Sequence, residues 1–245
     1  MEATSSAADL TVFVPTRGRP GQVVDFASEF ESHCTSSTKL VLIVDTDDPE
    51  CSRYVAKVAG RWDIYIAPET RRGMVGALNA AFRAYNYEDK LGFAVGFMGD
   101  DHRPRTAGWD TEYLSVLRGF GTGFVYGNDL YQGETMPTQV AFTTDIARAL
   151  SYMSPPELDH LCVDVVWREL GKRIDAIKYL PDVIVEHMHP LAGKAKNDKN
   201  YKIVNSNLIA RHDNDAYLTY MEGGRFEEDL GRIKMMMENG YCEDR

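Results

Sequence analysis

The first hundred residues alternate between short apolar runs and stretches with helical periodicity, and this alternation limits the possible folds more than any other feature. Runs of apolar and β-branched residues occupy 10–14, 39–44, 63–67 and 91–98. The first three are followed by helical patterns over 21–33, 51–58 and 72–85. Buried strands that alternate with helices form a mostly parallel sheet with helices on both faces. The sequence therefore predicts an α/β, Rossmann-like fold.

Weaker patterns continue this organisation to about residue 190. We expect helices at 109–117, 144–153 and 158–170, and strands at 123–126, 140–143, 177–179 and 183–186. The residues after Pro190 are polar and loop-like, and polar helices and a methionine-rich tail follow. A length of 245 residues suits a single domain. We expect a flexible tail at 1–8, the α/β domain at 9–190 and a loop-and-helix C-terminal extension at 191–245.

Composition excludes several classes of protein. No apolar run approaches the roughly 20 residues that a membrane span needs, and the start resembles no secretory signal. The four cysteines form no CxxC pair and suit free thiols in a reducing compartment. These features predict a cytoplasmic protein. A formal net charge of −10 argues against a partner with a long phosphate backbone, such as nucleic acid.

Charged side chains gather where the predicted strands end. Ligands of open α/β sheets bind outside the carboxyl ends of the strands. Those ends, at 15–19, 45–48, 68–72 and 100–103, hold most of the notable charge in this half of the chain. Arginine makes bidentate contacts with phosphate. Six arginines lie in or beside the strand ends: Arg17, Arg19, Arg71, Arg72, Arg103 and Arg105.

Asp100 and Asp101 follow the fourth apolar run, directly after Gly99. Two adjacent carboxylates repel each other, and a hard divalent cation offsets that repulsion. Mg²⁺ or Mn²⁺ binds carboxylate oxygens and substrate phosphates together. The structural alternative is an aspartate that caps backbone N–H groups. His102 and Arg103, next in the chain, favour the metal interpretation.

His187 and His189 end the last predicted strand. Residues two apart on a strand point to the same face, so both imidazoles can reach one metal ion. One can instead bind metal while the other binds phosphate, or both can be ordinary loop histidines. The chain has no HExxH pattern, which argues against a zinc protease.

Three other charged residues are candidates for a binding or catalytic role. Asp164 lies in an otherwise apolar helical stretch, where it is either a buried carboxyl whose raised pKa suits a general base or an ordinary residue on the solvent side of the helix. Asp45 ends the second strand, where it can bind a nucleobase or ribose or simply form a turn. Arg72 opens a predicted helix, whose N-terminus favours anions.

Taken in order, these segments resemble the GT-A glycosyltransferases, particularly the family-2-like group. The matching segments are the strand and loop at 12–19, Asp45, the Gly…Ala…Asn pattern at 73–80, and Gly99-Asp100-Asp101, which stands where that family has its DxD-type metal motif. The aspartates here are adjacent rather than spaced by one residue. The compact chain is also similar in style to enzymes of phage and actinobacterial genomes.

The resemblance implies roles for individual residues. Asp101, with Asp100, holds the donor diphosphate through Mn²⁺ or Mg²⁺, and His187 or His189 completes the metal site. Asp164 is the base, and Trp109 and Asp110 line the sugar or acceptor pocket. The remaining donor-binding positions are Pro15, Thr16, Arg17, Asp45, Arg72, Gly76 and Asn79.

The implied function is transfer of a sugar from a nucleoside-diphosphate sugar to an acceptor hydroxyl. A UDP-sugar is the default donor, and the acceptor is a protein, a glycan, a small molecule or a modified DNA base. Direct displacement predicts inversion, although a late metal-binding histidine also occurs in retaining enzymes. The alternatives are a sugar nucleotidyltransferase and a non-catalytic binding module. A nucleotidyltransferase normally needs a glycine-rich loop after the first strand, where 16–19 contains one glycine.

Overall fold

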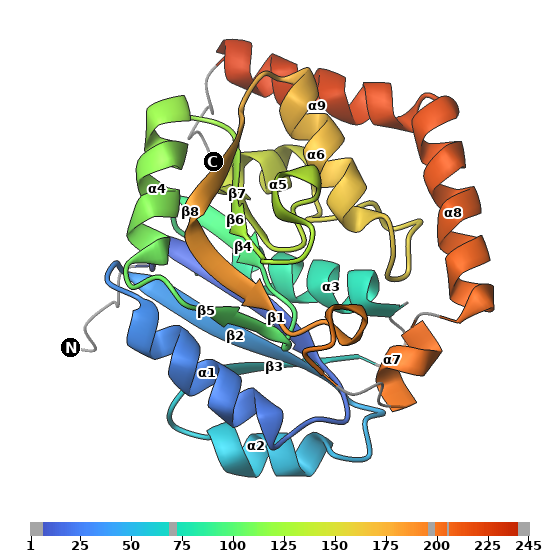
Figure 1. The fold of residues 1–245 in the computed structure, drawn as a ribbon. Coiled ribbons are helices and arrows are strands. Elements are labelled where there is room, and N and C mark those ends of the chain that lie inside the picture. The colour runs from blue at the N-terminus through green and yellow to red at the C-terminus, as the bar shows by residue number, and fades with distance from the viewer. Residues whose placement is uncertain (1–6, 69–72, 196–198, 205, 240–245) are drawn as a thin grey trace.

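The computed structural model describes residues 7–68, 73–195, 199–204 and 206–239 (Figure 1). The other residues, which include Arg72 and most of the predicted N-terminal tail, lie outside this description. Ala8, which we placed in the tail, is buried, and its carbonyl lies against Gly92. Ala8 therefore belongs to the packed α/β domain and not to the predicted tail.

An eight-stranded sheet forms the centre of the molecule, in the order β3-β2-β1-β4-β7-β6-β8-β5. Strands β7 and β5 run opposite to the other six, which are parallel. The predicted α/β fold with a mostly parallel sheet is confirmed. The strands are β1 (Leu10–Thr16), β2 (Thr38–Asp45), β3 (Asp63–Ala67), β4 (Ala94–Phe97), β5 (His102–Pro104), β6 (Phe124–Asn128), β7 (Val140–Thr143) and β8 (Ile177–His187).

Helices cover both faces of this sheet (Figure 1). One face packs against α1 (Gln22–His33), α2 (Cys51–Val58) and α4 (Trp109–Phe120). The other packs against α3 (Gly73–Tyr87), α5 (Thr144–Leu150), α6 (Val163–Arg173), α8 (Asn207–Glu222) and α9 (Arg225–Asn239). The sequence of β1 is continuously apolar because both of its faces are buried. Val12 and Val14 pack on the face covered by α1, α2 and α4, and Phe13 packs on the opposite face.

The second half of the sheet differs from the sequence prediction. The two short strands expected at 177–179 and 183–186 are one strand, β8, which contains Pro181. Its pairing with β6 shifts register between Gly127 and Asn128, and such an irregularity accommodates a proline within a sheet. Strand β5 was not predicted, because three residues give no periodicity.

The C-terminal helices pack directly on the α/β core. Tyr220, Phe226 and Ile233 are buried in the same apolar core as α3 and α6. The Asp229 carboxylate on α9 accepts hydrogen bonds from Tyr152, after α5, and from Tyr220 on α8, the latter at 2.9 Å. Two 3₁₀ turns, η1 (Gly133–Thr135) and η2 (Pro190–Ala192), and the short helix α7 (Lys199–Val204) complete the described elements. None of the helices described here is long and apolar enough to cross a membrane.

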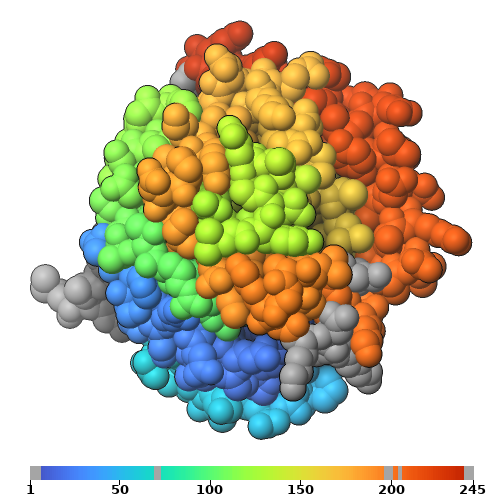
Figure 2. All heavy atoms as spheres, viewed as in Figure 1, coloured from blue at the N-terminus to red at the C-terminus, as the bar shows by residue number. Residues whose placement is uncertain are grey.

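The segment that follows β8 packs against the loop that follows β6. Residues around η2, in orange, lie against the yellow-green loop that follows β6 (Figure 2). The His189 and Tyr131 rings stack there with centroids 4.9 Å apart, and Lys194 donates to the carbonyl of Leu130. The loop after β6 and the segment after β8 therefore form one continuous wall.

Trp109 and Asp110 are structural residues, which corrects their assignment to a sugar or acceptor pocket. The Trp109 ring is fully buried against Phe30 and Tyr113. The Asp110 carboxylate, also fully buried, accepts hydrogen bonds from the N–H groups of Thr35 and Ser36 at 3.0 Å each. It also accepts one from the Thr38 hydroxyl at 2.7 Å. Both side chains hold the start of α4 to the α1–β2 connection.

Replacement of Asp110 by alanine removes the buried acceptor of three part-buried hydrogen bonds, each of which typically contributes about 0.5–1.5 kcal/mol. We expect Asp110→Ala to lower the free energy of unfolding by about 2–4 kcal/mol in urea denaturation. Glu112→Ala removes an exposed carboxylate from the same helical turn and should cost less than about 1 kcal/mol. Equal losses in the two variants would contradict this role of Asp110.

Candidate functional site

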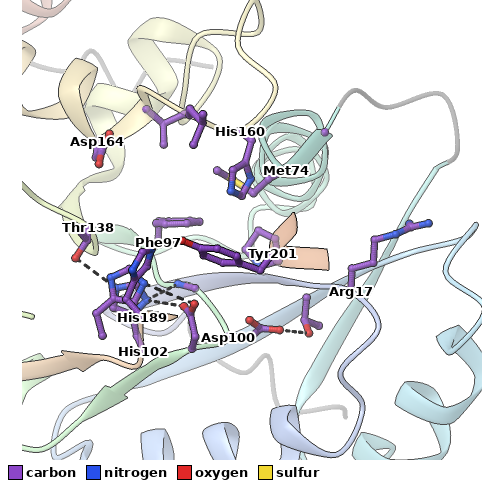
Figure 3. A pocket seen from close by; sticks show the side chains of 18 of the residues that line it. Arg17, Met74, Phe97, Asp100, His102, Thr138, His160, Asp164, His189 and Tyr201 are labelled. Atoms are coloured by element: carbon purple, nitrogen blue, oxygen red, sulfur yellow. Dashed lines mark hydrogen bonds and ion pairs between the residues drawn. The ribbon is translucent and has the colours of Figure 1, made fainter. Parts of the chain in front are cut away.

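A cavity of about 660 Å³ opens at the carboxyl ends of the parallel strands. Its floor comes from the residues after β1 and β4 and from the end of β8, and its roof from residues 158–162 and the start of α6 (Figure 3). We call residues 158–162 the roof loop. Nine of the predicted site residues line this cavity: Pro15, Thr16, Arg17, Asp45, Asp100, Asp101, Asp164, His187 and His189.

Asp100 joins the ends of β1 and β4. Its buried carboxylate accepts a hydrogen bond from the Thr16 hydroxyl at 2.7 Å and one from the Arg19 guanidinium at 2.6 Å. Burial raises the pKa of Asp100, and the charge of Arg19 opposes that rise. Since both carboxylate oxygens are engaged inside the protein, Asp100 holds the loop after β1 in place.

Asp101 is the carboxylate that faces the cavity. Its side chain is 30% exposed. One oxygen, Oδ2, lies 3.6 Å from Nε2 of His187, and the other, Oδ1, lies 3.5 Å from Nδ1 of His102. Among the described residues, Asp101, His102 and His187 form one of two groups whose ligand atoms are close enough to hold a metal ion.

The electrostatics of this group suit a cation. His187 lies between the carboxylates of Asp101 and Asp129, the latter 3.8 Å from its Nδ1. Burial lowers the pKa of His187, but the two carboxylates outweigh burial and raise it to about 9. Burial also pushes the pKa of Asp101 upward, yet the contact with His187 and the nearby positive charges hold it below its usual range. The protein thus stabilises positive charge at this point, and its oxygen and nitrogen atoms suit Mn²⁺ or Mg²⁺.

His102 is not available as a metal ligand in this arrangement. Its Nδ1 accepts a hydrogen bond from the Gly99 N–H at 3.0 Å, and its Nε2 lies 3.4 Å from the Thr138 hydroxyl. Burial lowers the pKa of His102 to about 3, so the ring is neutral. It stacks on His187 with centroids 4.3 Å apart, because the β5–β8 register sets the two residues opposite each other. Asp101 and His187 are therefore the better pair of ligands.

His189 lies beside this group but has other partners. Its Nδ1 accepts a hydrogen bond from the Leu191 N–H at 3.2 Å, and the Tyr201 hydroxyl lies 3.5 Å from its Nε2. The ring stacks on Tyr131 at the cavity wall. Of the two late histidines, His187 is the one that the fold brings to Asp101.

The far end of the floor holds Arg17 and Asp45. The Arg17 guanidinium contacts Asp45 at 2.7 Å and Asp47 at 2.6 Å. The hydrogen bond to Asp47 is the main cause of a raised Arg17 pKa. Pro15 and Met74 line the same cavity and add apolar surface. The result is a slot with one guanidinium, one carboxylate and apolar walls, which suits a flat polar ring with hydrogen-bonding edges.

The roof loop depends on the C-terminal extension. The buried Asp213 carboxylate on α8 accepts hydrogen bonds from the backbone N–H groups of Asp159 and His160 at 2.9 Å each, and of Leu161 at 2.6 Å. On the other side, the Val75 N–H on α3 donates to the Asp159 carbonyl at 3.1 Å. Gly73 lies so close that a Cβ atom there would fall 2.2 Å from the same oxygen.

The predicted helix at 158–170 is therefore wrong at its start. Helix α6 begins at Val163, after Cys162 adopts a left-handed conformation with φ 66°. Residues 158–162 form a loop instead because Asp213 supplies their N–H groups with an acceptor outside the helix. This loop places the His160 ring over the cavity, and burial lowers the pKa of that ring (Figure 3).

Asp164 faces the cavity from the first turn of α6 (Figure 3). Burial raises its pKa, and the hydrogen bond that Oδ1 accepts from the Val165 N–H at 2.9 Å opposes this. A carboxylate with a raised pKa beside a ligand cavity is suited to accept a proton.

Three predicted donor-binding residues are not placed at the cavity. The Asn79 side chain is buried and bonds the backbone of Met153 and Ser154, which fixes the turn after α5. Gly76 lies on α3 but is not among the lining residues, whereas Gly73, Met74 and Ala77 are. Arg72 lies outside the described residues. Sequence reasoning also missed Asp129, Thr138, His160 and Asp213, because their importance comes from contacts distant in the chain.

The second group of possible ligands joins Asp159 of the roof loop to His212 and Asp213 on α8. Asp213 already accepts three backbone hydrogen bonds and lies 3.0 Å from Nδ1 of His212. Because these contacts use the lone pairs of both of its oxygens, this group serves as a structural clasp for the roof loop.

Comparison with solved structures finds glycosyltransferases. The mannosyltransferase PcManGT from Pyrobaculum calidifontis, in complex with GDP-Man and Mn²⁺, has a TM-score of 0.59 and 15% identity, over 96% of this chain and 77% of that chain. TarS from S. aureus has a TM-score of 0.57 and 12% identity, over 88% of this chain and 43% of that chain.

Glucosyl-3-phosphoglycerate synthase from Mycobacterium tuberculosis, in complex with Mn²⁺, UDP and glucosyl-3-phosphoglycerate, has a TM-score of 0.54 and 13% identity. The match covers 76% of this chain and 74% of that chain. No protein-family model and no curated protein sequence matches the chain. At these identities the similarity defines the fold: the chain has the GT-A fold of glycosyltransferases, as the resemblance in its sequence implied.

The contact between Asp213 and the roof loop predicts a local effect. Asp213→Ala removes the acceptor for three N–H groups, and we expect the amides of Asp159, His160 and Leu161 to exchange with solvent at least about tenfold faster. Hydrogen–deuterium exchange with mass spectrometry measures this. Asp215→Ala, an exposed position on the same helix, is the control. Unchanged protection of the roof loop in Asp213→Ala would show that other contacts hold it.

Proposed function

We propose that this protein is a metal-dependent glycosyltransferase, which moves a sugar from a nucleoside-diphosphate sugar to an acceptor hydroxyl. The observation that carries the proposal is the position of Asp101 and His187, 3.6 Å apart on the floor of a large cavity at the carboxyl end of the sheet. The solved structures of this fold include complexes with Mn²⁺, with GDP-Man and with UDP.

Different residues of the floor would contact different parts of the donor. Asp101 and His187 would hold Mn²⁺ or Mg²⁺, which neutralises the charge of a leaving nucleoside diphosphate. The slot of Arg17, Asp45 and Met74 receives the nucleobase, with uracil as the default. Arg19 lines the cavity between these two sites while it is paired with Asp100, so its charge reaches the diphosphate from a fixed position.

Asp164 acts as the general base on the roof side. It accepts the proton of the acceptor hydroxyl, whose oxygen then forms a bond to the anomeric carbon as the bond to the diphosphate breaks. Attack from the face opposite the leaving group inverts the anomeric configuration. The raised pKa of Asp164 strengthens it as a base while it is ionised.

The loop after β1 argues against the nucleotidyltransferase alternative. Such an enzyme needs backbone N–H groups there to surround a triphosphate. Here the Gly18 N–H donates to the Asp48 carboxylate at 2.7 Å, and the Arg19 N–H donates to the Tyr54 hydroxyl at 2.6 Å. These donors are directed into the protein and away from the cavity.

Donor class is tested by thermal shift with UDP, GDP, CDP and dTDP, each with and without Mn²⁺. A ligand at 100 times its Kd stabilises the native state by about 2.7 kcal/mol. For a chain of this size that raises the Tm by about 5–10 °C. We expect one nucleotide to give a Mn²⁺-dependent shift that is absent in Asp101→Ala and retained in Asp182→Ala, an exposed carboxylate on β8. No shift with any nucleotide would contradict the proposed function.

Asp164→Asn tests the base. Loss of a general base lowers kcat by about 10²–10⁴-fold, and we expect donor binding to change little. Because the base acts when deprotonated, the wild-type rate should rise with pH through the Asp164 pKa, on a limb above the ordinary carboxyl value of about 3.9. Glu169→Gln, on the same helix outside the cavity, is the control. A retained kcat in Asp164→Asn would assign proton transfer to another group.

A further inference from the structure

A chain of hydrogen bonds runs behind the floor of the cavity from the Gly99 backbone to Asp129. The first step sets the tautomer of His102. Because the Gly99 N–H donates to Nδ1 at 3.0 Å, that nitrogen carries the lone pair and the proton of the neutral ring sits on Nε2. The Nε2–H faces the Thr138 hydroxyl at 3.4 Å and donates to it.

The second step sets the direction of the Thr138 hydroxyl. Since its oxygen accepts from His102, its proton points to Oδ2 of Asp129, 2.8 Å away. The other Asp129 oxygen, Oδ1, accepts from the backbone N–H groups of Tyr131, Gln132 and Gly133 at 2.9, 2.7 and 2.8 Å. Asp129 is 1% exposed, and four donors hold it as an oriented carboxylate.

The third step reaches His187. Oδ2 of Asp129 lies 3.8 Å from Nδ1 of His187, a buried nitrogen without a closer hydrogen-bond partner among the described residues. A carboxylate there favours a proton on Nδ1, so that a cation which replaces the proton on Nε2 would meet an Nε2 lone pair directed at Asp101. Carboxylates that orient metal-binding imidazoles in this way typically affect metal affinity 10–100-fold.

We infer that Asp129 and Thr138 are positioning residues that hold His187 in the tautomer and orientation needed to bind a divalent cation with Asp101. This inference rests on the proposed metal-dependent function and assigns roles to two residues that are not themselves proposed as metal ligands. The His102 ring serves the same purpose, since it stacks on His187 and transmits the hydrogen-bond direction from Gly99 to Thr138.

The test uses Mn²⁺ as the probe and Asp129→Asn as the first variant. The three backbone N–H groups keep the new amide oxygen in the place of Oδ1, so the NH₂ group faces Thr138 and His187. An NH₂ group favours the opposite His187 tautomer. We expect the Kd for Mn²⁺, measured by calorimetry, to rise about 10–100-fold. Glu134→Gln makes the same carboxylate-to-amide change at an exposed position of the same loop and should leave the Kd unchanged.

A second pair of variants keeps the inference testable if Asp129→Asn folds poorly. Thr138→Val removes the hydroxyl at nearly constant volume, and we expect it to weaken Mn²⁺ binding. Thr138→Ser keeps the hydroxyl, and we expect it to retain wild-type affinity. Electron spin-echo envelope modulation of bound Mn²⁺ gives a direct signature, because a coordinated imidazole nitrogen adds ¹⁴N modulation. That modulation should be present in the wild type and reduced in Asp129→Asn and Thr138→Val.

The outcomes separate this inference from the proposed function. Unchanged Mn²⁺ affinity and ¹⁴N modulation in folded Asp129→Asn and Thr138→Val would overturn the inference and leave the function standing. Mn²⁺ binding that depends on Asp129 and Thr138, in a protein that transfers or hydrolyses no nucleotide sugar, would support the inference and overturn the function. A wild-type protein that binds no Mn²⁺, alone or with UDP or GDP, would overturn both.

Discussion

The need to compensate buried charge at the carboxyl edge of the sheet determines how the site is assembled. Asp100 is buried after β4, and a carboxylate there persists only if donors surround it. Thr16, at the end of the neighbouring strand β1, and Arg19, in the loop after β1, supply those donors. Its neighbour Asp101 faces the cavity, beside His187 and His102. One ion pair thus gives the two adjacent carboxylates different surroundings: Asp100 is bonded inside the protein, and Asp101 carries the proposed role in metal binding.

The end of the sheet formed by β6, β8 and β5 provides side chains that strands β1 to β4 lack. The β5–β8 pairing sets His102 opposite His187, and the parallel contact of β6 with β8 brings Asp129, which follows β6, to the same place. The floor therefore receives an acid from the residues after β4 and an imidazole from β8, and a second acid, from the loop after β6, lies behind it. No single segment of the chain contains this combination.

The C-terminal helices support the roof of the same cavity. Asp213 on α8 holds the roof loop, and Asp229 on α9 fastens α8 and the turn after α5 to the core. The roof loop in turn sets the start of α6, and with it the position of Asp164. The composition of the chain changes near residue 190, but the structure does not divide there. The roof loop, before residue 190, is held by the side chain of Asp213, which comes after it.

The sequence alone determined the layered fold, since continuous apolar runs that alternate with helical periodicity can bury both faces of a sheet in few other ways. It also placed Asp45, Asp100 and Asp101 at strand ends, because the carboxyl ends of parallel strands meet at one edge. Tertiary structure decided the rest. It selected His187 over His189, engaged Asp100 and Asn79 in internal hydrogen bonds, and buried Trp109 and Asp110. These outcomes depend on strand register and on partners distant in the chain, such as Thr16 and Asp100, which lie 84 positions apart and which no local pattern records.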